Sequence, residues 1–346
     1  MDVAAAGLFR ADTTRLNINA AAVDHPFGLA GNAGDNILTA TRNGESLFDY
    51  GGNDKMYGGG GDDDYVIMRV DFWTPLDVIS DSSGTDDLYF TDPADGVVMV
   101  VGNQVRGIER FVVSGSALAT GGDYRRDITT TNSAGIDASL VAGPILMAGN
   151  DGGNYLAATT KNDTIIGYGG NDTVYGGAGN DLIETQVNGA SLDEIHAGAA
   201  TEGNRLVLNG TLAGTMVIDL SAADQIVSVA GVAEVLAQDG INHVDASAVL
   251  GFSASLTGNG LANNLVGTIK DDTLAGGAGA DTLVGGGGND VFIVGPLAEF
   301  PGNESVAGGD GRICSSSIRT WRDRPWSSPV RGSRTWKRWK SPGSSP

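Results

Sequence analysis

The sequence predicts an all-β protein wound as a parallel β-solenoid, and three observations support this prediction. A nine-residue pattern of glycine, asparagine and aspartate recurs in three separate parts of the chain, as in GYGGNDTVYGGAGNDLIE at residues 167–184. One position of the pattern is apolar or aromatic in every copy. Helical periodicity is weak throughout, and residues 232–237 are the best short candidate for a helix.

The repeats form three blocks of four nonapeptides. The first block, residues 31–66, reads GNAGDNILT, ATRNGESLF, DYGGNDKMY and GGGGDDDYV. The second, residues 149–184, reads GNDGGNYLA, ATTKNDTII, GYGGNDTVY and GGAGNDLIE. The third, residues 258–293, reads GNGLANNLV, GTIKDDTLA, GGAGADTLV and GGGGNDVFI.

Two positions of this register have a constant chemical character. Position six is an amide or an acid, and its residues are Asn36, Glu45, Asp54, Asp63, Asn154, Asp163, Asp172, Asp181, Asn263, Asp272, Asp281 and Asp290. Position eight is apolar or aromatic, and its residues are Leu38, Leu47, Met56, Tyr65, Leu156, Ile165, Val174, Ile183, Leu265, Leu274, Leu283 and Phe292.

Each nonapeptide divides into a turn and a short strand. Positions one to six are rich in residues that tolerate tight turns and positive φ. Positions seven to nine suffice for a three-residue strand, with position eight pointing to one side. Repeating this unit winds the chain into a flattened coil with two nonapeptides per full turn. The position-eight side chains then meet inside, and strands of successive coils stack in parallel.

This winding places each position-six residue directly below the one two nonapeptides further on. Stacked strands lie about 4.7–4.9 Å apart, and two bare carboxylates at that spacing repel each other by about 1 kcal/mol in water. Calcium binds oxygen at roughly 2.3–2.6 Å, so it fits between two such groups, whereas magnesium needs a closer approach. Zinc prefers His and Cys, which the repeats lack. We therefore expect calcium sites.

Counting two nonapeptides forward gives six pairs of position-six residues. The pairs are Asn36 with Asp54, Glu45 with Asp63, Asn154 with Asp172, Asp163 with Asp181, Asn263 with Asp281, and Asp272 with Asp290. We expect the three fully acidic pairs to bind calcium more tightly. The Asn that opens each block is either a ligand or only a turn residue that caps the coil.

The charge of the chain agrees with a cation as partner. It carries 42 Asp and Glu against 21 Lys and Arg, a formal net charge of −21, which argues against nucleic acid. No stretch approaches the ~18 apolar residues of a membrane span. The N-terminus lacks the basic and apolar regions of a cleaved signal peptide, so a secreted protein of this kind would need another export route.

The blocks and the segments between them suggest a linear organisation. The predicted units are residues 1–30 as the end of a spacer, 31–66 as block one, 67–148 as a β-rich spacer, 149–184 as block two, 185–257 as a second β-rich spacer, 258–311 as block three with its exit strand, and 312–346 as a basic tail. The tail holds nine Lys and Arg, one acid and four of the five Trp. We predict that it is disordered or arises from a shifted reading frame; the alternative is a segment that binds polyanions or membrane surfaces.

The nonapeptides resemble the GGxGxDxUx repeats of the RTX, or haemolysin-type calcium-binding, family. GGAGNDLIE and GGAGADTLV fit fully, as do GGGGDDDYV and GGGGNDVFI if Tyr65 and Phe292 count as the apolar residue. The resemblance implies a parallel β-roll, calcium in the turns and secretion by a type I system; the six pairs would correspond to about six calcium ions. It covers the nonapeptides, while the tail departs from the family.

The resemblance also implies backbone carbonyl ligands from positions one, three and five of the glycine-rich turns. These would be Gly58, Gly60, Asp62, Gly167, Gly169, Asn171, Gly176, Ala178, Asn180, Gly276, Ala278, Ala280, Gly285, Gly287 and Asn289. The expected function is calcium-coupled folding in a structural or adhesion module outside the cell, with a glycan or a cell surface as candidate partner.

The rival interpretation is an enzyme, in which the repeats are the scaffold of a secreted hydrolase or of a carbohydrate-modifying protein. No HExxH, GxSxG or Ser-His-Asp grouping supports it. His25, His196 and His243 stand in dissimilar sequence contexts. We therefore expect no catalytic residues.

Overall fold

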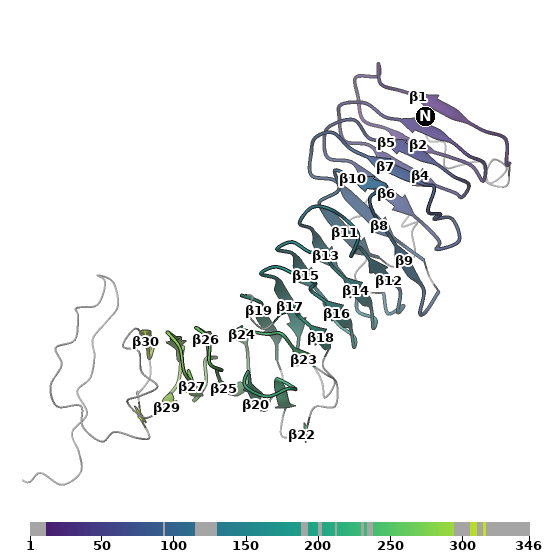
Figure 1. Ribbon diagram of the computed structural model, residues 1–346. Coiled ribbons are helices and arrows are strands. Elements are labelled where there is room, and N and C mark those ends of the chain that lie inside the picture. The colour runs from purple at the N-terminus through teal and green to yellow at the C-terminus, as the bar shows by residue number, and fades with distance from the viewer. Residues whose placement is uncertain are drawn as a thin grey trace, which may run out of the picture.

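The computed structural model describes residues 12–92, 94–114, 130–187, 193–199, 203–211, 213–229, 232–233, 238–293, 305–309 and 314–315. Within these ranges the chain consists of short strands, turns and connecting segments, and no residue is helical. The strands stack coil upon coil from the N-terminal to the C-terminal end, which makes the molecule an elongated solenoid (Figure 1). The predicted all-β, parallel fold is thereby confirmed.

One parallel sheet of 13 strands runs along the whole described solenoid. Its strands, in spatial order, are β2 (Gly28–Ala30), β4 (Ser46–Asp49), β6 (Asp64–Ile67), β8 (Asp87–Phe90), β11 (Arg110–Val113), β13 (Leu146–Ala148), β15 (Thr164–Ile166), β17 (Leu182–Gln186), β19 (Arg205–Gly210), β24 (His243–Val249), β26 (Asn264–Val266), β28 (Thr282–Val284) and β30 (Ser305–Ala307). We call it the long sheet.

The other strands form three shorter sheets. The first contains β1 (Asn17–Asn19), β3 (Ile37–Thr39), β5 (Lys55–Tyr57), β7 (Val78–Ser80) and β10 (Val105–Arg106). The second contains β9 (Val98–Val100), β12 (Gly135–Asp137), β14 (Tyr155–Ala157), β16 (Thr173–Tyr175), β18 (Glu194–His196) and β23 (Gln238–Asp239). The third contains β22 (Val232–Ala233), β21 (Ile226–Val229), β20 (Gly214–Asp219), β25 (Phe252–Thr257), β27 (Thr273–Ala275), β29 (Val291–Ile293) and β31 (Cys314–Ser315).

The only antiparallel pairings in the described chain join β20 to β21 and β21 to β22. Val232 and Ala233 lie in the segment that was the best candidate for a helix, and that expectation is wrong for these two residues. They form β22, because the chain turns back on itself and pairs Val232 with Val229. Residues 234–237 lie outside the described part.

The strand register shows that two nonapeptides make one coil. Ile37 pairs with Lys55 on one side of the solenoid and Ser46 with Asp64 on the other, each a step of 18 residues. All twelve position-eight side chains are at most 5% exposed. They join one continuous apolar core, which holds the flattened coil closed from within.

The segments between the blocks continue the same stack. Strand β8 pairs with β6 of the first block and β11 pairs with β8, before β13 leads into the second block. The core passes through these coils by way of Ile79, Leu88 and Phe111. Here one coil takes 23 residues instead of 18, as from Leu88 to Phe111, because the turns are longer.

The blocks differ in which of their strands join the long sheet. In the first two blocks these are the second and fourth strands, β4 with β6 and β15 with β17. In the third block they are the first and third strands, β26 and β28. The segment 185–257 therefore shifts the repeat by half a coil.

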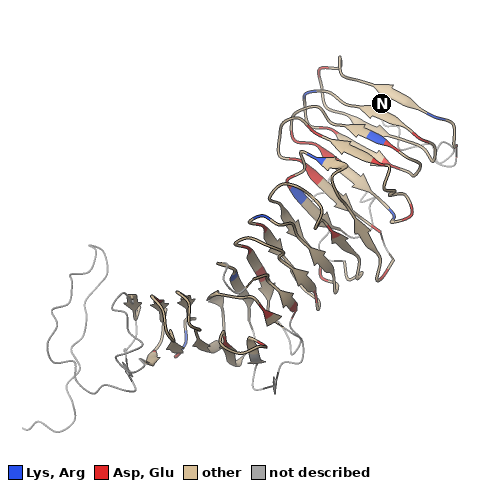
Figure 2. Ribbon diagram, in the orientation of Figure 1, with Lys and Arg blue, Asp and Glu red and all other residues tan. Residues whose placement is uncertain are grey.

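Two strands follow the third block. Strand β30 pairs with β28, and β31 pairs with β29, so the stack reaches Cys314 and Ser315 in the segment predicted to be a tail. The rest of that segment lies outside the described residues. In the described part no helix is long and apolar enough to cross a membrane. Asp and Glu lie both at the turns and on strands along the stack, among scattered Lys and Arg (Figure 2).

Candidate metal centre

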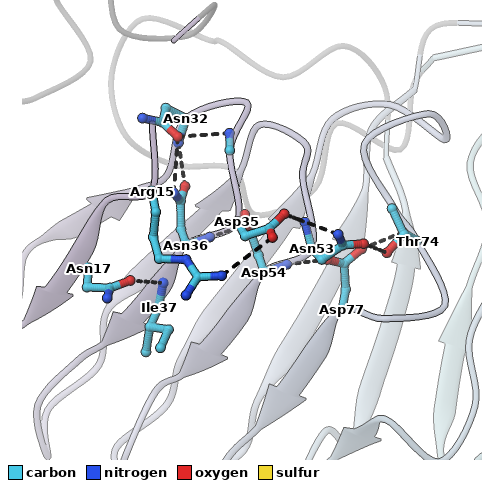
Figure 3. A network of polar contacts seen from close by, with 11 residues as sticks. Arg15, Asn17, Asn32, Asp35, Asn36, Ile37, Asn53, Asp54, Thr74 and Asp77 are labelled. Atoms are coloured by element: carbon cyan, nitrogen blue, oxygen red, sulfur yellow. Dashed lines mark hydrogen bonds and ion pairs between the residues drawn. The ribbon is translucent and has the colours of Figure 1, made fainter. Parts of the chain in front are cut away.

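The stacked turns bring each predicted pair of position-six residues together. In all six pairs the backbone N–H of the first residue donates to a carboxylate oxygen, Oδ1, of the second, at 2.6–3.1 Å. The pairing rule of two nonapeptides forward therefore holds as a matter of geometry. Figure 3 shows one such ladder, in which Asn36, Asp54 and Asp77 follow one another at the start of stacked strands.

The contact differs from the expected one. We expected the two side chains to face each other, whereas the side chain of the second residue faces the backbone of the first. The reason is that a buried N–H at the junction of turn and strand needs an acceptor. A carboxylate supplies it through a charge-assisted hydrogen bond and is thereby fixed in orientation.

The twelve turns fall into two classes. We call the turns 31–36, 40–45, 149–154, 158–163, 258–263 and 267–272 the opening turns, since they are the first two of each block. In each, the N–H of position two donates to the position-six side chain at 2.6–3.0 Å. The donors are Asn32, Thr41, Asn150, Thr159, Asn259 and Thr268.

We call the turns 49–54, 58–63, 167–172, 176–181, 276–281 and 285–290 the closing turns. Here the backbone at position two or three takes a different course, with φ of +95° at Gly177 and +63° at Tyr168. Within the described chain no group hydrogen bonds to Oδ2 of Asp54, Asp63, Asp172 or Asp290. These four side chains are at most 1% exposed, so their second oxygen faces neither water nor a protein donor.

In the closing turns that begin with glycine, this position-one residue keeps space open beside the position-six oxygen, whereas the turn 49–54 begins with the buried Asp49. A Cβ on Gly167 would collide with Oδ2 of Asp172, and one on Gly285 would collide with Oδ2 of Asp290. The carbonyl oxygen of Gly167 faces the turn before it, 2.7 Å from where a Cβ on Gly149 would lie. A buried carboxylate oxygen therefore lies beside an opening that only glycine leaves, close to backbone carbonyls.

Position-five carbonyls face the preceding turn in the same way. The carbonyl oxygen of Asn171 would lie 2.7 Å from a Cβ on Gly153. The predicted carbonyl ligands at positions one and five thus line the space between stacked turns. The role of all predicted ligands, position three included, stays a prediction.

Burial makes the negative charge of the closing turns costly. It raises the pKa of Asp63 to about 9, and burial together with the nearby Asp193 raises the pKa of Asp172 to about 9. The pKa of Asp163, in an opening turn, is also raised by burial, but Ile145 and Thr159 oppose the rise by donating hydrogen bonds. The closing turns therefore need a proton or a cation, and an all-oxygen donor set of this kind suits calcium.

The carboxylate ladder extends beyond the nonapeptides. Asp77 accepts a hydrogen bond from the N–H of Asp54, Asp86 from that of Asp63, and Asp193 from that of Asp172, at 2.5–2.9 Å. Asn204 and Glu109 take equivalent places one coil after Asp181 and Asp86. Our register missed these residues because their coils are 21 or 23 residues long.

A shorter sequence pattern marks these residues of the ladder. In Asp77-Val78-Ile79 and Asp193-Glu194-Ile195 an acid precedes a buried apolar residue by two positions, as positions six and eight do in the nonapeptides. The pattern is too short to be distinctive without the coil that surrounds it.

The fold and the turns define a class: a parallel β-solenoid whose stacked glycine-rich turns bury carboxylates that need a proton or a cation. Comparison with known families agrees. The RTX calcium-binding nonapeptide repeat, in four copies, matches residues 30–65, 148–183 and 257–292. The match of these three segments to the repeat model confirms the resemblance seen in the sequence. A search of curated proteins found no match.

Proposed function

We propose that the protein is a calcium-dependent folding module that acts outside the cell as a structural or adhesion element. The single observation that supports this most is the set of unpartnered carboxylate oxygens in the closing turns, at Asp54, Asp63, Asp172 and Asp290. Calcium bound there would replace the missing hydrogen-bond donors and cancel the buried charge.

The proposed stoichiometry follows from the turns. Six closing turns, one ion each, would give about six calcium ions. Position six supplies the carboxylate, and the carbonyls of positions one, three and five would complete the oxygen shell. The position-six oxygens of the opening turns already accept hydrogen bonds within their own turn, so we assign them a supporting role.

We infer an extracellular location from the strength expected of such sites. Flexible all-oxygen sites in extracellular modules bind calcium at roughly 10⁻⁴–10⁻³ M, so they would stay empty in the cytosol and fill outside it. Type I secretion is the export route that the repeat family suggests. The external partner we propose is a glycan or another component of a cell surface.

The test is to follow β structure by circular dichroism while calcium is added to the chelator-treated full chain. We expect calcium to induce β structure at roughly 10⁻⁴–10⁻³ M. Magnesium at equal concentration should not, because it requires shorter metal–oxygen distances and gives up its waters reluctantly. Identical circular dichroism spectra in calcium and in chelator would contradict the proposal.

An enzymatic role would show itself differently. Polysaccharides, lipids and casein offered to the calcium-loaded protein should remain unchanged. Turnover of any of them would move the function from binding to catalysis without altering the calcium proposal.

A further inference from the structure

The turn that follows the first block along the stack differs from the nonapeptides. Residues 81–86, DSSGTD, lead into β8, where Leu88 occupies the place of position eight and is fully buried. This turn lies directly above the closing turn 58–63, because Asp63 donates its N–H to Oδ1 of Asp86 at 2.8 Å. Its first residue is Asp81, where the closing turns of blocks two and three have glycine.

Asp81 brings a third carboxylate to the junction. One oxygen each from Asp63, Asp81 and Asp86 lie within 4.8 Å of one another. Asp63 and Asp86 are buried and Asp81 is partly buried. None of the ion pairs found in the described chain involves these three residues.

The protein holds each of the three side chains in place. Asp63 accepts the N–H of Glu45 at 2.6 Å. Asp81 accepts the N–H of Ser82 at 2.6 Å through one oxygen and the hydroxyl of Tyr65 at 2.7 Å through the other. Tyr65 is a position-eight residue, and its counterparts at the end of the other blocks, Ile183 and Phe292, have no hydroxyl.

A second observation points to a ligand in this cluster. No N–H or hydroxyl of the described residues donates a hydrogen bond to Oδ2 of Asp63, although the side chain is fully buried and lies against the carboxyl of Asp81. A Cβ on Gly58 would collide at once with that oxygen, with Oδ2 of Asp81 and with the hydroxyl of Tyr65. The three oxygens therefore converge on one small opening, which the glycine leaves free.

We propose that Asp63, Asp81 and Asp86 bind one calcium ion that joins the first block to the coil after it. The proposal rests on calcium binding by the stacked turns, but two of its three carboxylates lie outside the matched repeats. Oxygens within 4.8 Å of one another can share a calcium ion, since each would lie at roughly 2.3–2.6 Å from it.

The number of carboxylates at this site determines whether it binds calcium at a lower concentration than the other sites. Three carboxylates exceed the one or two that position six supplies elsewhere, and affinity for calcium rises with the number of charged ligands. The junction site would therefore fill at lower calcium concentration than the sites whose pair contains Asn154 or Asn263; the site of Asn36 and Asp54 has Asp49 and Asp77 close by and is left out of this ranking. A shared proton is the alternative occupant of the cluster.

The experiment compares the full-length protein with Asp81→Asn and with a control, Asp151→Asn, which removes the same charge from an exposed turn. Calcium bound per chain is counted by equilibrium dialysis, and terbium, as a calcium substitute, is followed by its emission on excitation of tyrosine. We expect Asp81→Asn to lose one ion per chain and the earliest phase of the terbium titration, and the control to lose neither.

Asp86→Asn provides an independent readout, because its amide oxygen can still accept the N–H of Asp63. It should also lose one ion, whereas Tyr65→Phe should keep the ion but reduce the sensitised emission. If both Asp variants bind as many ions as the unchanged protein, the cluster holds only a proton and the proposal is overturned. Calcium-induced β structure would persist in that case, and the proposed function would stand. If the unchanged protein shows no calcium response, both ideas fall together.

Discussion

The opening and closing turns of a block share a backbone register but solve the same electrostatic problem differently. In the opening turn 158–163, Oδ2 of Asp163 accepts hydrogen bonds from the N–H and the hydroxyl of Thr159, each at 2.8 Å. In the closing turn 167–172, Oδ2 of Asp172 has no such donor in the described chain. Both side chains are almost fully buried.

The difference teaches that the repeat contains a folding part and a binding part. A threonine at position two lets a turn satisfy its own position-six carboxylate, and an asparagine there accompanies a position-six amide, so these turns can form without an ion. A residue at positive φ turns the backbone away and leaves the carboxylate to a cation. Each block therefore begins with two self-sufficient turns, on which the ion-dependent turns stack.

The largest expected effect is on the pH dependence of the calcium-free protein. Burial raises the pKa of Asp49 to about 8 and the pKa values of Asp63 and Asp172 to about 9, against 3.8 in an unfolded chain. The folded state therefore binds protons more tightly than the unfolded state. The stability from these protons is fully present below about pH 4 and is lost as the pH rises towards about 9.

The direction of this pH dependence is checked by measuring the melting temperature of the protein in chelator at a series of pH values. The melting temperature should fall between about pH 5 and pH 9, and saturating calcium should abolish the fall, because the ion takes the place of the proton. A calcium-free melting temperature that rises across this range would contradict the assignment of buried, unneutralised carboxylates.

The next largest effect concerns the backbone of a closing turn. Gly177 has a φ of +95°, and a Cβ there would collide with the carbonyl oxygen of Thr159. Gly177→Ala should lower the free energy of unfolding by about 3 kcal/mol or more in calcium, since strain and backbone displacement add.

Gly260→Ala is the matched control, in an opening turn. A Cβ on Gly260 meets nothing within 4 Å, and its φ is not in the positive range, so we expect a change within about 0.5 kcal/mol. Urea unfolding of both variants in calcium decides this. Equal losses would show that the two classes of turn do not differ in backbone demand.

Smaller effects are expected from replacing Asp172 or Asp163 by Asn, and the two substitutions should change the calcium-free stability in opposite directions. Asp172→Asn removes the need for this buried group beside Asp193 to take up a proton on folding, so it should raise the calcium-free melting temperature at neutral pH by a few degrees. It should also weaken calcium binding roughly tenfold at that turn, because a ligand charge is lost.

Asp163→Asn should behave in the reverse way. Its oxygens accept from Ile145 and Thr159, so an amide NH₂ would face a donor and cost about 1–3 kcal/mol with or without calcium. The calcium midpoint should stay the same. Calcium titrations of both variants by circular dichroism test the pair, and a shifted midpoint in Asp163→Asn would make the opening turns binding turns too.

Much of this architecture could be predicted from the sequence, because the nonapeptide is a physical unit. The constant apolar residue at position eight indicated an interior, and Leu38 and Tyr65 are indeed fully buried. The turn-forming residues at positions one to six indicated two turns per coil, and the 18-residue register follows from that.

The detail of the site could not be predicted, since it depends on where atoms point. The sequence indicates that Asp54 lies below Asn36, but not that its carboxylate bonds to the backbone N–H of Asn36. Asp77 and Asp193 escaped notice because longer turns hide their place in the ladder. The convergence of Asp63 and Asp81 arises from a turn that no longer reads as a repeat.

Two nonapeptides make one coil. Whether a block gains an even or an odd number of nonapeptides therefore decides which face of the solenoid every later strand occupies. Gaining or losing 18 residues within a block would lengthen or shorten the solenoid and leave every later side chain on its own face. A change of nine residues would exchange the two faces for everything downstream. The half-coil shift between the second and third blocks is such an exchange, absorbed by the segment 185–257. The length of such a solenoid can therefore change by pairs of nonapeptides without other adjustment. Gaining or losing a single nonapeptide requires a further segment that restores the faces downstream.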